Sequence, residues 1–329
     1  FKAIVSKFMQ KYLDTGEINP NNLVTQTGVS AICEALSFAM FDEGDYLIIP
    51  TPYYTGFDHD FTKRFKVNFL YAKLDPEQGF EHNIEAFKQA YENCSDKEKI
   101  KAVLLTDPHN PTGEILSEQF RSEIIAFCEN KKISLISDEI YALSNHDGSP
   151  HHSLYREAIE AGIDAHFLYG MAKDFALGGM KTGFYYSENQ DIVKAMQDLS
   201  YFHPVSTSTQ LVLENILGDH SFLDEYIPTA KKRLQSIPMI IAQQLPKLSF
   251  INPNSALFML LDLSKYCKNA KDEEELFKLI LNKYKINISP GVDLGLKVPG
   301  FFRVCFAQKK ESVLEFIVRM KEFSEKELS

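Results

Sequence analysis

The chain has 329 residues, of which 44% are hydrophobic and 24% charged, so it fits a globular protein of two domains and excludes a disordered, collagen-like or low-complexity chain. Acidic residues outnumber basic ones by 45 to 35. The resulting net charge of −10 repels phosphate backbones and anionic lipid surfaces, so we expect neither nucleic acid nor a membrane as a partner.

Short apolar runs alternate with helical patterns through the first two thirds of the chain, which is typical of a mostly parallel sheet covered by helices on both faces. Residues 1–10 already have an amphipathic helical pattern with no initiator Met, so we expect that an upstream segment is missing. Strands are predicted at residues 23–26, 46–49, 67–70, 102–106, 133–137, 166–169 and 182–186. Helices are predicted at residues 30–40, 84–92, 117–130 and 155–161.

From about Val205 the pattern changes to long helical stretches, predicted at 207–217 and 222–244. Strands at 255–261, 286–289 and 302–306 and helices at 272–284 and 311–325 then predict a smaller α+β part. We place the boundary near residues 205–220, bridged by the long helix. The predicted division is a large domain over 1–210 and a small C-terminal domain over 211–329.

The five cysteines, Cys33, Cys94, Cys128, Cys267 and Cys305, form an odd set without a C-x-x-C pair. Such a set favours a reduced, cytoplasmic compartment. The longest apolar runs, such as residues 102–105, are far shorter than the roughly 20 residues that a membrane-spanning helix needs.

Ligands of open parallel sheets bind beyond the carboxyl ends of the strands, so the residues that follow each predicted strand matter most. Residues 27–30 open a helix whose free N–H groups can hold a phosphate, Asn110 lies in a turn, Asp138 ends a buried strand and Lys173 follows another. Taken singly, each has an ordinary explanation as a cap, a turn, a strand end or a surface lysine. Together they supply the anion cradle, amide donor, carboxylate and amine that pyridoxal phosphate needs.

Longer motifs surround these residues in a fixed order along almost the whole chain. They are Pro50-Thr-Pro-Tyr-Tyr54 with Gly56-Phe57-Asp58, Asp107-Pro-His-Asn-Pro-Thr-Gly113, Ser137-Asp-Glu-Ile-Tyr141, Lys173-Asp174, Ile288-Ser-Pro-Gly291, and Pro299-Gly-Phe-Phe-Arg303-Val-Cys-Phe-Ala307. With them the sequence resembles class I/II aminotransferases of fold type I, and it looks most like their 1-aminocyclopropane-1-carboxylate (ACC) synthase-like branch. The resemblance implies a mostly parallel seven-stranded sheet covered by helices, plus a smaller α+β C-terminal domain.

The resemblance also implies a role for each residue around the cofactor ring. Lys173 would form the Schiff base with pyridoxal phosphate and move the proton of the reacting carbon. Asp138 would pair with the pyridine nitrogen, and Asn110 and Tyr141 would bond the phenolic oxygen. Tyr54 would stack on the ring.

The resemblance also implies one anion-binding group at each of the two ends of the site. Val29 and Ser30 would hold the phosphate, joined by Lys181. Arg303 would bind the substrate carboxylate as a bidentate fork, with Asn110 beside it.

Two positions depart from the family pattern. The family usually has a hydroxyl residue three positions before the lysine and an arginine eight positions after it, whereas this chain has Gly170 and Lys181. Gly170 offers no side-chain donor, and Lys181 keeps the charge but loses the planar fork. Losing one charged hydrogen bond, worth roughly 1.5–3 kcal/mol, predicts weaker cofactor binding.

The resemblance leaves several activities open. Transamination between an amino acid and a 2-oxo acid comes first, because it is the commoner activity of such scaffolds. The alternatives are a lyase of ACC synthase type acting on S-adenosylmethionine, a C–S lyase, and a non-catalytic protein, which Gly170 and Lys181 would favour. We expect a homodimer, because sites of this family are built between subunits, and no metal.

Overall fold

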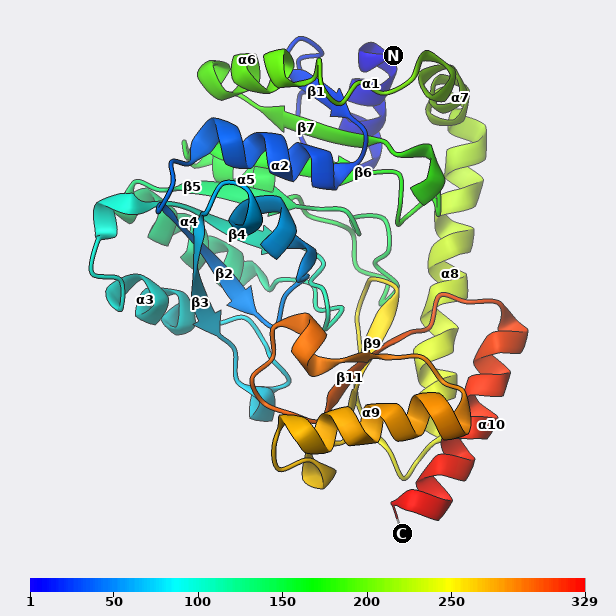
Figure 1. The fold of residues 1–329 in the computed structure, drawn as a ribbon. Coiled ribbons are helices and arrows are strands. Elements are labelled where there is room, and N and C mark those ends of the chain that lie inside the picture. Colours follow the sequence, from blue (N-terminus) through cyan, green and yellow to red (C-terminus); the bar gives the residue numbers. More distant parts are fainter. Residues whose placement is uncertain (329) are drawn as a thin grey trace.

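Two β-sheets organise the chain, which is described over residues 1–328 by a computed structural model (Figure 1). The large sheet has seven strands in the order β1-β7-β6-β5-β4-β2-β3. Neighbours from β6 to β3 are parallel, and β7 runs antiparallel to both β6 and β1. The strands are β1 (Leu23–Gln26), β2 (Tyr46–Thr51), β3 (Asn68–Lys73), β4 (Ile100–Thr106), β5 (Ser134–Asp138), β6 (Ala165–Gly170) and β7 (Gly183–Ser187).

Helices cover both faces of the large sheet because successive strand residues point to opposite sides. Leu47 and Ile49 pack into one apolar cluster, whereas Ile48 between them packs into the other. The first face carries α2 (Val29–Met40), α6 (Gln190–Leu199) and a π-helical segment, η1 (Asp58–Lys63). The second carries α1 (Lys2–Tyr12), α3 (Ile84–Glu92), α4 (Glu118–Lys131) and α5 (Leu154–Glu160).

The predicted mostly parallel, doubly covered sheet is confirmed, with strand ends shifted by at most three residues. Two elements on the first face were missed, α6 and η1. In α6, Val193 and Met196 are buried, and Ile192 and Leu199 pack beside them at the three- and four-residue spacing of one helical face, so the sequence held a signal for this helix that the prediction did not use.

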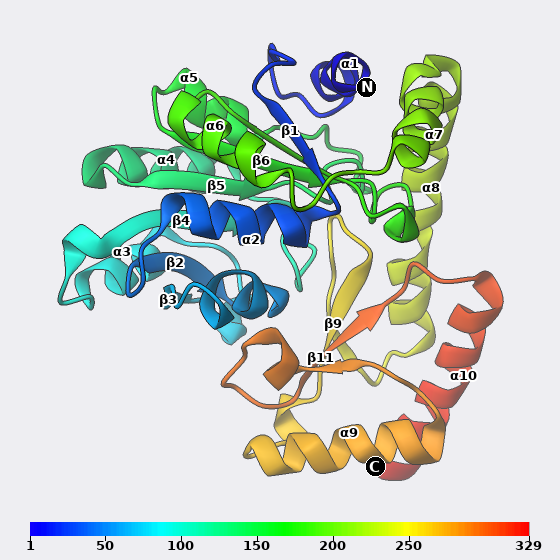
Figure 2. The same cartoon turned by 45° about the horizontal axis from the view of Figure 1, so that its top comes forward.

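The small sheet has four antiparallel strands in the order β10-β11-β9-β8. Its strands are β8 (Ser249–Ile251), β9 (Phe258–Asp262), β10 (Ser289–Pro290) and β11 (Phe301–Cys305), and its apolar core lies under α8 (His220–Gln244), α9 (Ala270–Tyr284) and α10 (Lys310–Glu327). The long α8 continues from α7 (Thr207–Gly218), beside the large sheet, down to the small one (Figure 2). The division at residue 210 remains a prediction.

Strand predictions in this part need correction. The strand expected at 255–261 starts only at Phe258, because the N–H groups of Asn254 and Ser255 bond the carbonyl oxygen of Gly113 instead of a sheet neighbour. The strand expected at 286–289 shrinks to Ser289–Pro290, and β8 was missed. Among the described residues, no helix is long and apolar enough to cross a membrane.

Successive side chains of β11 point to opposite faces of the small sheet, and one of them reaches the large part of the molecule. Phe302 and Val304 point into the core under the helices. The residue between them, Arg303, points to the opposite face, and its guanidinium reaches Asn110 of the large part.

Candidate active site

A cavity of about 350 Å³ lies where β1, β4, β5 and β6 end. The carboxyl ends of parallel strands meet at one edge of the sheet, so residues far apart in the sequence come together there. The cavity is lined by eight of the nine predicted site residues, namely Val29, Ser30, Tyr54, Asn110, Asp138, Tyr141, Lys173 and Lys181. The ninth, Arg303, comes from β11 and is hydrogen-bonded to Asn110.

The first turn of α2 forms one end of the cavity. Gly28 precedes it with φ of +104° and provides no side-chain cap, so the N–H groups of Val29 and Ser30 have no partner within the helix. Gly183 of β7 lets the strand approach closely, because a Cβ there would lie 2.7 Å from the Val29 nitrogen. Uncapped N–H groups at the positive end of a helix form an anion site.

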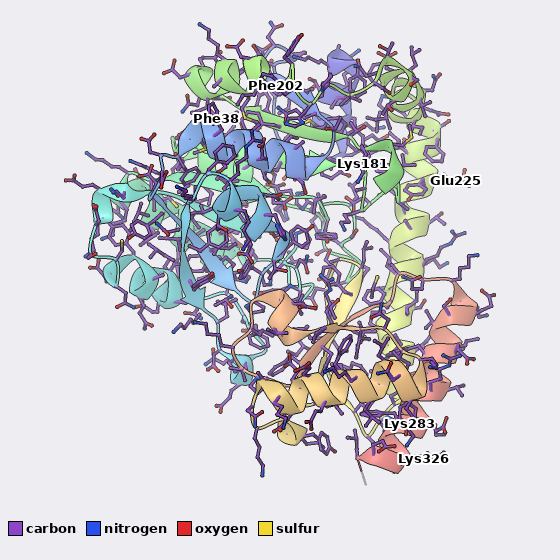
Figure 3. The ribbon with its side chains drawn as sticks, viewed as in Figure 1. Phe38, Lys181, Phe202, Glu225, Lys283 and Lys326 are labelled. Carbon is purple, nitrogen blue, oxygen red and sulfur yellow. The ribbon has the colours of Figure 1, made fainter. Side chains whose placement is uncertain are left out.

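Lys181 is the cation at this end. It lies between η4 (Gly178–Met180) and β7, close to the start of α2 (Figure 3). The side chain is exposed, and no ion pair within residues 1–328 involves it. Its charge is therefore available to an anion that the helix N-terminus holds.

Asp138 is the last residue of β5 and is almost fully buried. Burial raises the pKa of its carboxyl to about 7, although the N–H of Ile140 and the charge of Lys173 act in the opposite direction. A cation placed against Asp138 would favour the ionised carboxylate, because opposite charges stabilise each other strongly away from water.

Lys173 and Tyr141 face each other, with the amine 6.0 Å from the centre of the tyrosine ring. Burial, followed by the positive charge of Arg303, lowers the pKa of Lys173. Burial likewise raises the pKa of Tyr141, so its phenol stays protonated and can donate. A larger neutral fraction makes the amine both a nucleophile and a base.

Arg303 is held against the cavity wall residue Asn110 and its surroundings by three contacts. It donates to the Asn110 side-chain oxygen at 2.8 Å and to Ser289 at 3.4 Å, and its guanidinium carbon lies 5.2 Å from the ring centre of Phe258. These contacts fix a guanidinium that has no carboxylate partner among the described residues.

Tyr54 extends over Gly56, and a Cβ at position 56 would lie 2.2 Å from the tyrosine ring. The ring meets Phe57 edge to face at 5.4 Å, and the side chain is about half exposed. The glycine therefore lets the ring fold against the cavity wall.

The sequence reasoning missed several lining residues, including Cys33, Phe57, Asp60 and Thr182. The sequence did hold a signal that Asp60 is buried. Phe57, Asp60 and Phe61 follow the three- and four-residue spacing of one helical face, and all three are buried in the structure.

Two buried carboxylates fix the loops around the cavity. Glu139, next to Asp138, accepts bonds from His151 at 2.7 Å and from the hydroxyls of Ser137 and Ser153, each at 2.9 Å. Asp174, next to Lys173, accepts bonds from the N–H of Leu143 at 3.0 Å, the hydroxyl of Tyr169 at 2.9 Å and the hydroxyl of Ser144.

His82, His109 and Glu114 lie within 4.8 Å of one another, a spacing that metal ligands can share. Protein groups already engage them: His109 bonds Thr112 at 2.9 Å and the carbonyl of Pro52 at 3.1 Å, and His82 bonds Glu114 at 2.7 Å. The His109 bond ties the turn after β4 to the end of β2, and the His82 bond ties the segment before α3 to Glu114. Within the described residues, the Nε2 of His82 is buried without a partner.

Comparison with known proteins identifies the family of this chain. The profile of the family described as aminotransferase class I and II matches residues 1–320. The chain belongs to this family. An ACC synthase, number 6 of Arabidopsis thaliana, is 34% identical over 96% of this chain and 66% of its own length. The ACC synthase of Vigna radiata var. radiata is 32% identical over 93% of this chain and 87% of its own length.

Solved structures agree on the fold of this aminotransferase family member. An aromatic aminotransferase from Pyrococcus horikoshii OT3 matches with a TM-score of 0.87 and 21% identity, over all of this chain and 86% of that one. Aspartate aminotransferase from Thermus thermophilus with maleate matches with a TM-score of 0.83 and 22% identity, over 98% of this chain and 80% of that one. At these identities the likeness shows the fold, which is of type I. The chain spans about two thirds of the first ACC synthase.

Membership in the aminotransferase family implies dependence on pyridoxal phosphate, and the cavity fits that group. The uncapped start of α2 suits its phosphate, the buried Asp138 suits its ring nitrogen, and the amine of Lys173 has a lowered pKa.

Gly170, one of the two departures, has a packing reason. A Cβ at position 170 would lie 2.9 Å from a methyl carbon of Val29 and 3.1 Å from the carbonyl oxygen of Thr182. Val29 thus occupies the space that a hydroxyl side chain would need.

Proposed function

We propose that the protein is a pyridoxal phosphate-dependent lyase of ACC synthase type, which acts on S-adenosylmethionine or a related amino acid. The observation that carries this proposal is near full-length similarity to ACC synthases, at 34% identity over 96% of the chain, together with a cavity that offers an amine, a carboxyl group and an anion cradle. Transamination, which the sequence placed first, becomes the second candidate, supported by the family description.

Five site residues carry the chemistry in this proposal. Arg303 binds the substrate carboxylate, and Asn110 fixes the guanidinium that does so. The amine of Lys173 removes the proton from the α-carbon. Asp138 holds a positive charge on the ring nitrogen, and Tyr141 donates to the phenolic oxygen. When bound, the cofactor supplies the electron sink for the carbanion.

Lyase and transaminase differ in where the electron pair of the α-carbon goes. In the lyase it forms a bond to the γ-carbon, the bond from that carbon to sulfur breaks, and the sulfonium leaves as a neutral thioether. In transamination the amino group is transferred instead, and a 2-oxo acid takes it up. The residues named above serve both outcomes.

The test is to incubate the protein and pyridoxal phosphate with S-adenosylmethionine and to measure ACC and methylthioadenosine by mass spectrometry. Equal amounts of both products support the proposal. Exchange of amino groups between amino acids and 2-oxo acids, without loss of S-adenosylmethionine, would support the transaminase. Neither reaction, together with no cofactor binding, would support the non-catalytic protein.

We also propose a homodimer. Phe38 of α2 and Phe202, after α6, expose 60% and 70% of their surface and lie in the same region of the molecule (Figure 3). Exposed aromatic side chains that gather on one face are typical of an interface. Sedimentation equilibrium should give a mass near twice 37.5 kDa.

A further inference from the structure

Asp60 is a buried carboxyl group in the cavity that none of the tasks above uses. It lies on η1, is 8% exposed, and lines the cavity together with Cys33 and Phe57. Within the described part of the chain its side chain has no hydrogen bond and no ion pair. An ionised carboxylate in such a place is costly, so the group must either keep its proton or meet a donor from a ligand.

The groups around Asp60 add no positive charge. Burial first, and then the negative charges of Asp138 and Glu34, raise the pKa of Asp60 to about 7. Burial first, and then the charge of Asp60, raise the pKa values of Cys33 and Tyr54. Cys33, Tyr54, Asp60 and Asp138 all line the same cavity.

Cations near this wall are engaged elsewhere or point away. Arg64 pairs with Glu34, and His203 lies 3.6 Å from the same carboxylate. His59 and Lys63, on η1 itself, are exposed. The carboxyl of Asp60 is therefore left facing neutral or acidic groups.

We propose that Asp60 belongs to the cofactor-binding residues as a neutral, protonated carboxyl, and that its ionisation weakens the binding of a phosphorylated ligand. A phosphate ester carries a charge of about −1.5 to −2 at neutral pH, so a further negative charge in the same cavity opposes it. The positive charge on the ring nitrogen is already balanced by Asp138 in the proposed function, so it does not offset a second carboxylate. Of the residues that line the cavity, Lys181 and the start of α2 are the groups proposed to hold the phosphate. Because a phosphorylated cofactor is part of the proposed function, this inference rests on it.

The first experiment measures the dissociation constant of pyridoxamine 5′-phosphate by calorimetry, at about pH 6 and about pH 8.5. This ligand has no aldehyde, so it forms no bond with Lys173. The proteins are the wild type, Asp60→Asn, and the control Asp58→Asn, whose side chain lies two residues away and can still accept the bond from Tyr53. Titration of the phosphate and of Lys173 is common to all three.

At about pH 6 we expect Asp60→Asn and the wild type to bind equally, because the amide replaces a protonated carboxyl. At about pH 8.5 we expect Asp60→Asn to bind at least about 10-fold more tightly than the wild type, because the amide removes a negative charge that repels the phosphate. Weaker binding by Asp60→Asn at both pH values would overturn the proposal, since it would mean that the ionised carboxylate attracts the ligand.

A second experiment needs no ligand and separates this proposal from the proposed function. Because the folded pKa of Asp60 lies above its unfolded value of about 3.9, the carboxyl costs stability as the pH rises toward 7. The urea midpoint of Asp60→Asn should therefore rise relative to the wild type between about pH 5 and about pH 8, and a constant difference would contradict a neutral Asp60. If the wild type binds no pyridoxamine phosphate at all, the proposed function fails, and the urea series alone decides whether Asp60 is neutral.

Discussion

At the scale of a single residue, the amine of Lys173 is the group that reacts in the proposed mechanism. Its side chain still reaches solvent, and partial burial together with the charge of Arg303 favours its neutral form. We expect Lys173→Ala to lower turnover by about 100- to 10,000-fold, the usual contribution of a general acid–base group. Product formation at saturating cofactor checks this, and the exposed Lys194→Ala serves as control. Full turnover by Lys173→Ala would refute the mechanism.

Gly170 and Val29 give a second prediction at this scale, because they share one space. Gly170→Ser should lower the free energy of unfolding by about 1–3 kcal/mol, the usual cost of overfilling a packed site. In a Val29→Ala background the cost of the same serine should be smaller by about 1 kcal/mol. Urea denaturation of the four proteins measures this coupling. Additive effects would show that the valine methyl does not exclude the side chain.

At the scale of secondary-structure elements, Asp174 joins the segment after β6 to the loop after β5 that carries Tyr141. Asp174→Ala would leave three donors without their acceptor, from Leu143, Ser144 and Tyr169. We expect the free energy of unfolding to fall by about 2–5 kcal/mol, measured in urea. Asp174→Asn keeps one oxygen and should lose less. Equal stability of Asp174→Ala and the wild type would contradict this linking role.

The Asp174 carboxyl also makes the stability of the folded chain depend on pH. Burial raises the pKa of Asp174 to about 6, above the unfolded value of about 3.9. The folded chain therefore binds this proton more tightly, and the stability that the proton provides is lost as the pH rises through about 6. Because the asparagine does not titrate, the stability of Asp174→Asn relative to the wild type should increase between about pH 4 and about pH 7.

At the scale of the whole molecule, the bond between Arg303 and Asn110 joins the small sheet to the cavity of the large one. We expect Arg303→Lys to raise the KM for the amino acid substrate by about 10- to 100-fold, because it replaces a planar fork by a point charge. The dissociation constant of the cofactor should stay unchanged. Arg319→Lys, on α10 away from the cavity, is the matched control. A loss of cofactor affinity instead would place Arg303 at the phosphate or the ring.

The sequence by itself determined the seven strands and most helices, because strands alternate with helices. Four strand ends with unusual side chains pointed to a pocket, and the resemblance to class I/II aminotransferases supplied the nine residues expected at the site. Eight of those residues line one cavity, since the carboxyl ends of parallel strands meet at one edge. Strand β8 was not predicted, because three residues are too few to show a period, whereas the helical spacing of α6 was present in the sequence and was not used.

Only the tertiary structure decided how distant segments meet. It brought the Asp60 carboxyl into the cavity, placed Val29 where a side chain at Gly170 would lie, and tied Tyr53 by its N–H to the carbonyl of Leu294 at 3.0 Å. These facts depend on contacts between residues far apart in the chain. A periodic pattern records which face of an element is buried, whereas it does not record which neighbour that face meets or whether a buried charge finds a partner there.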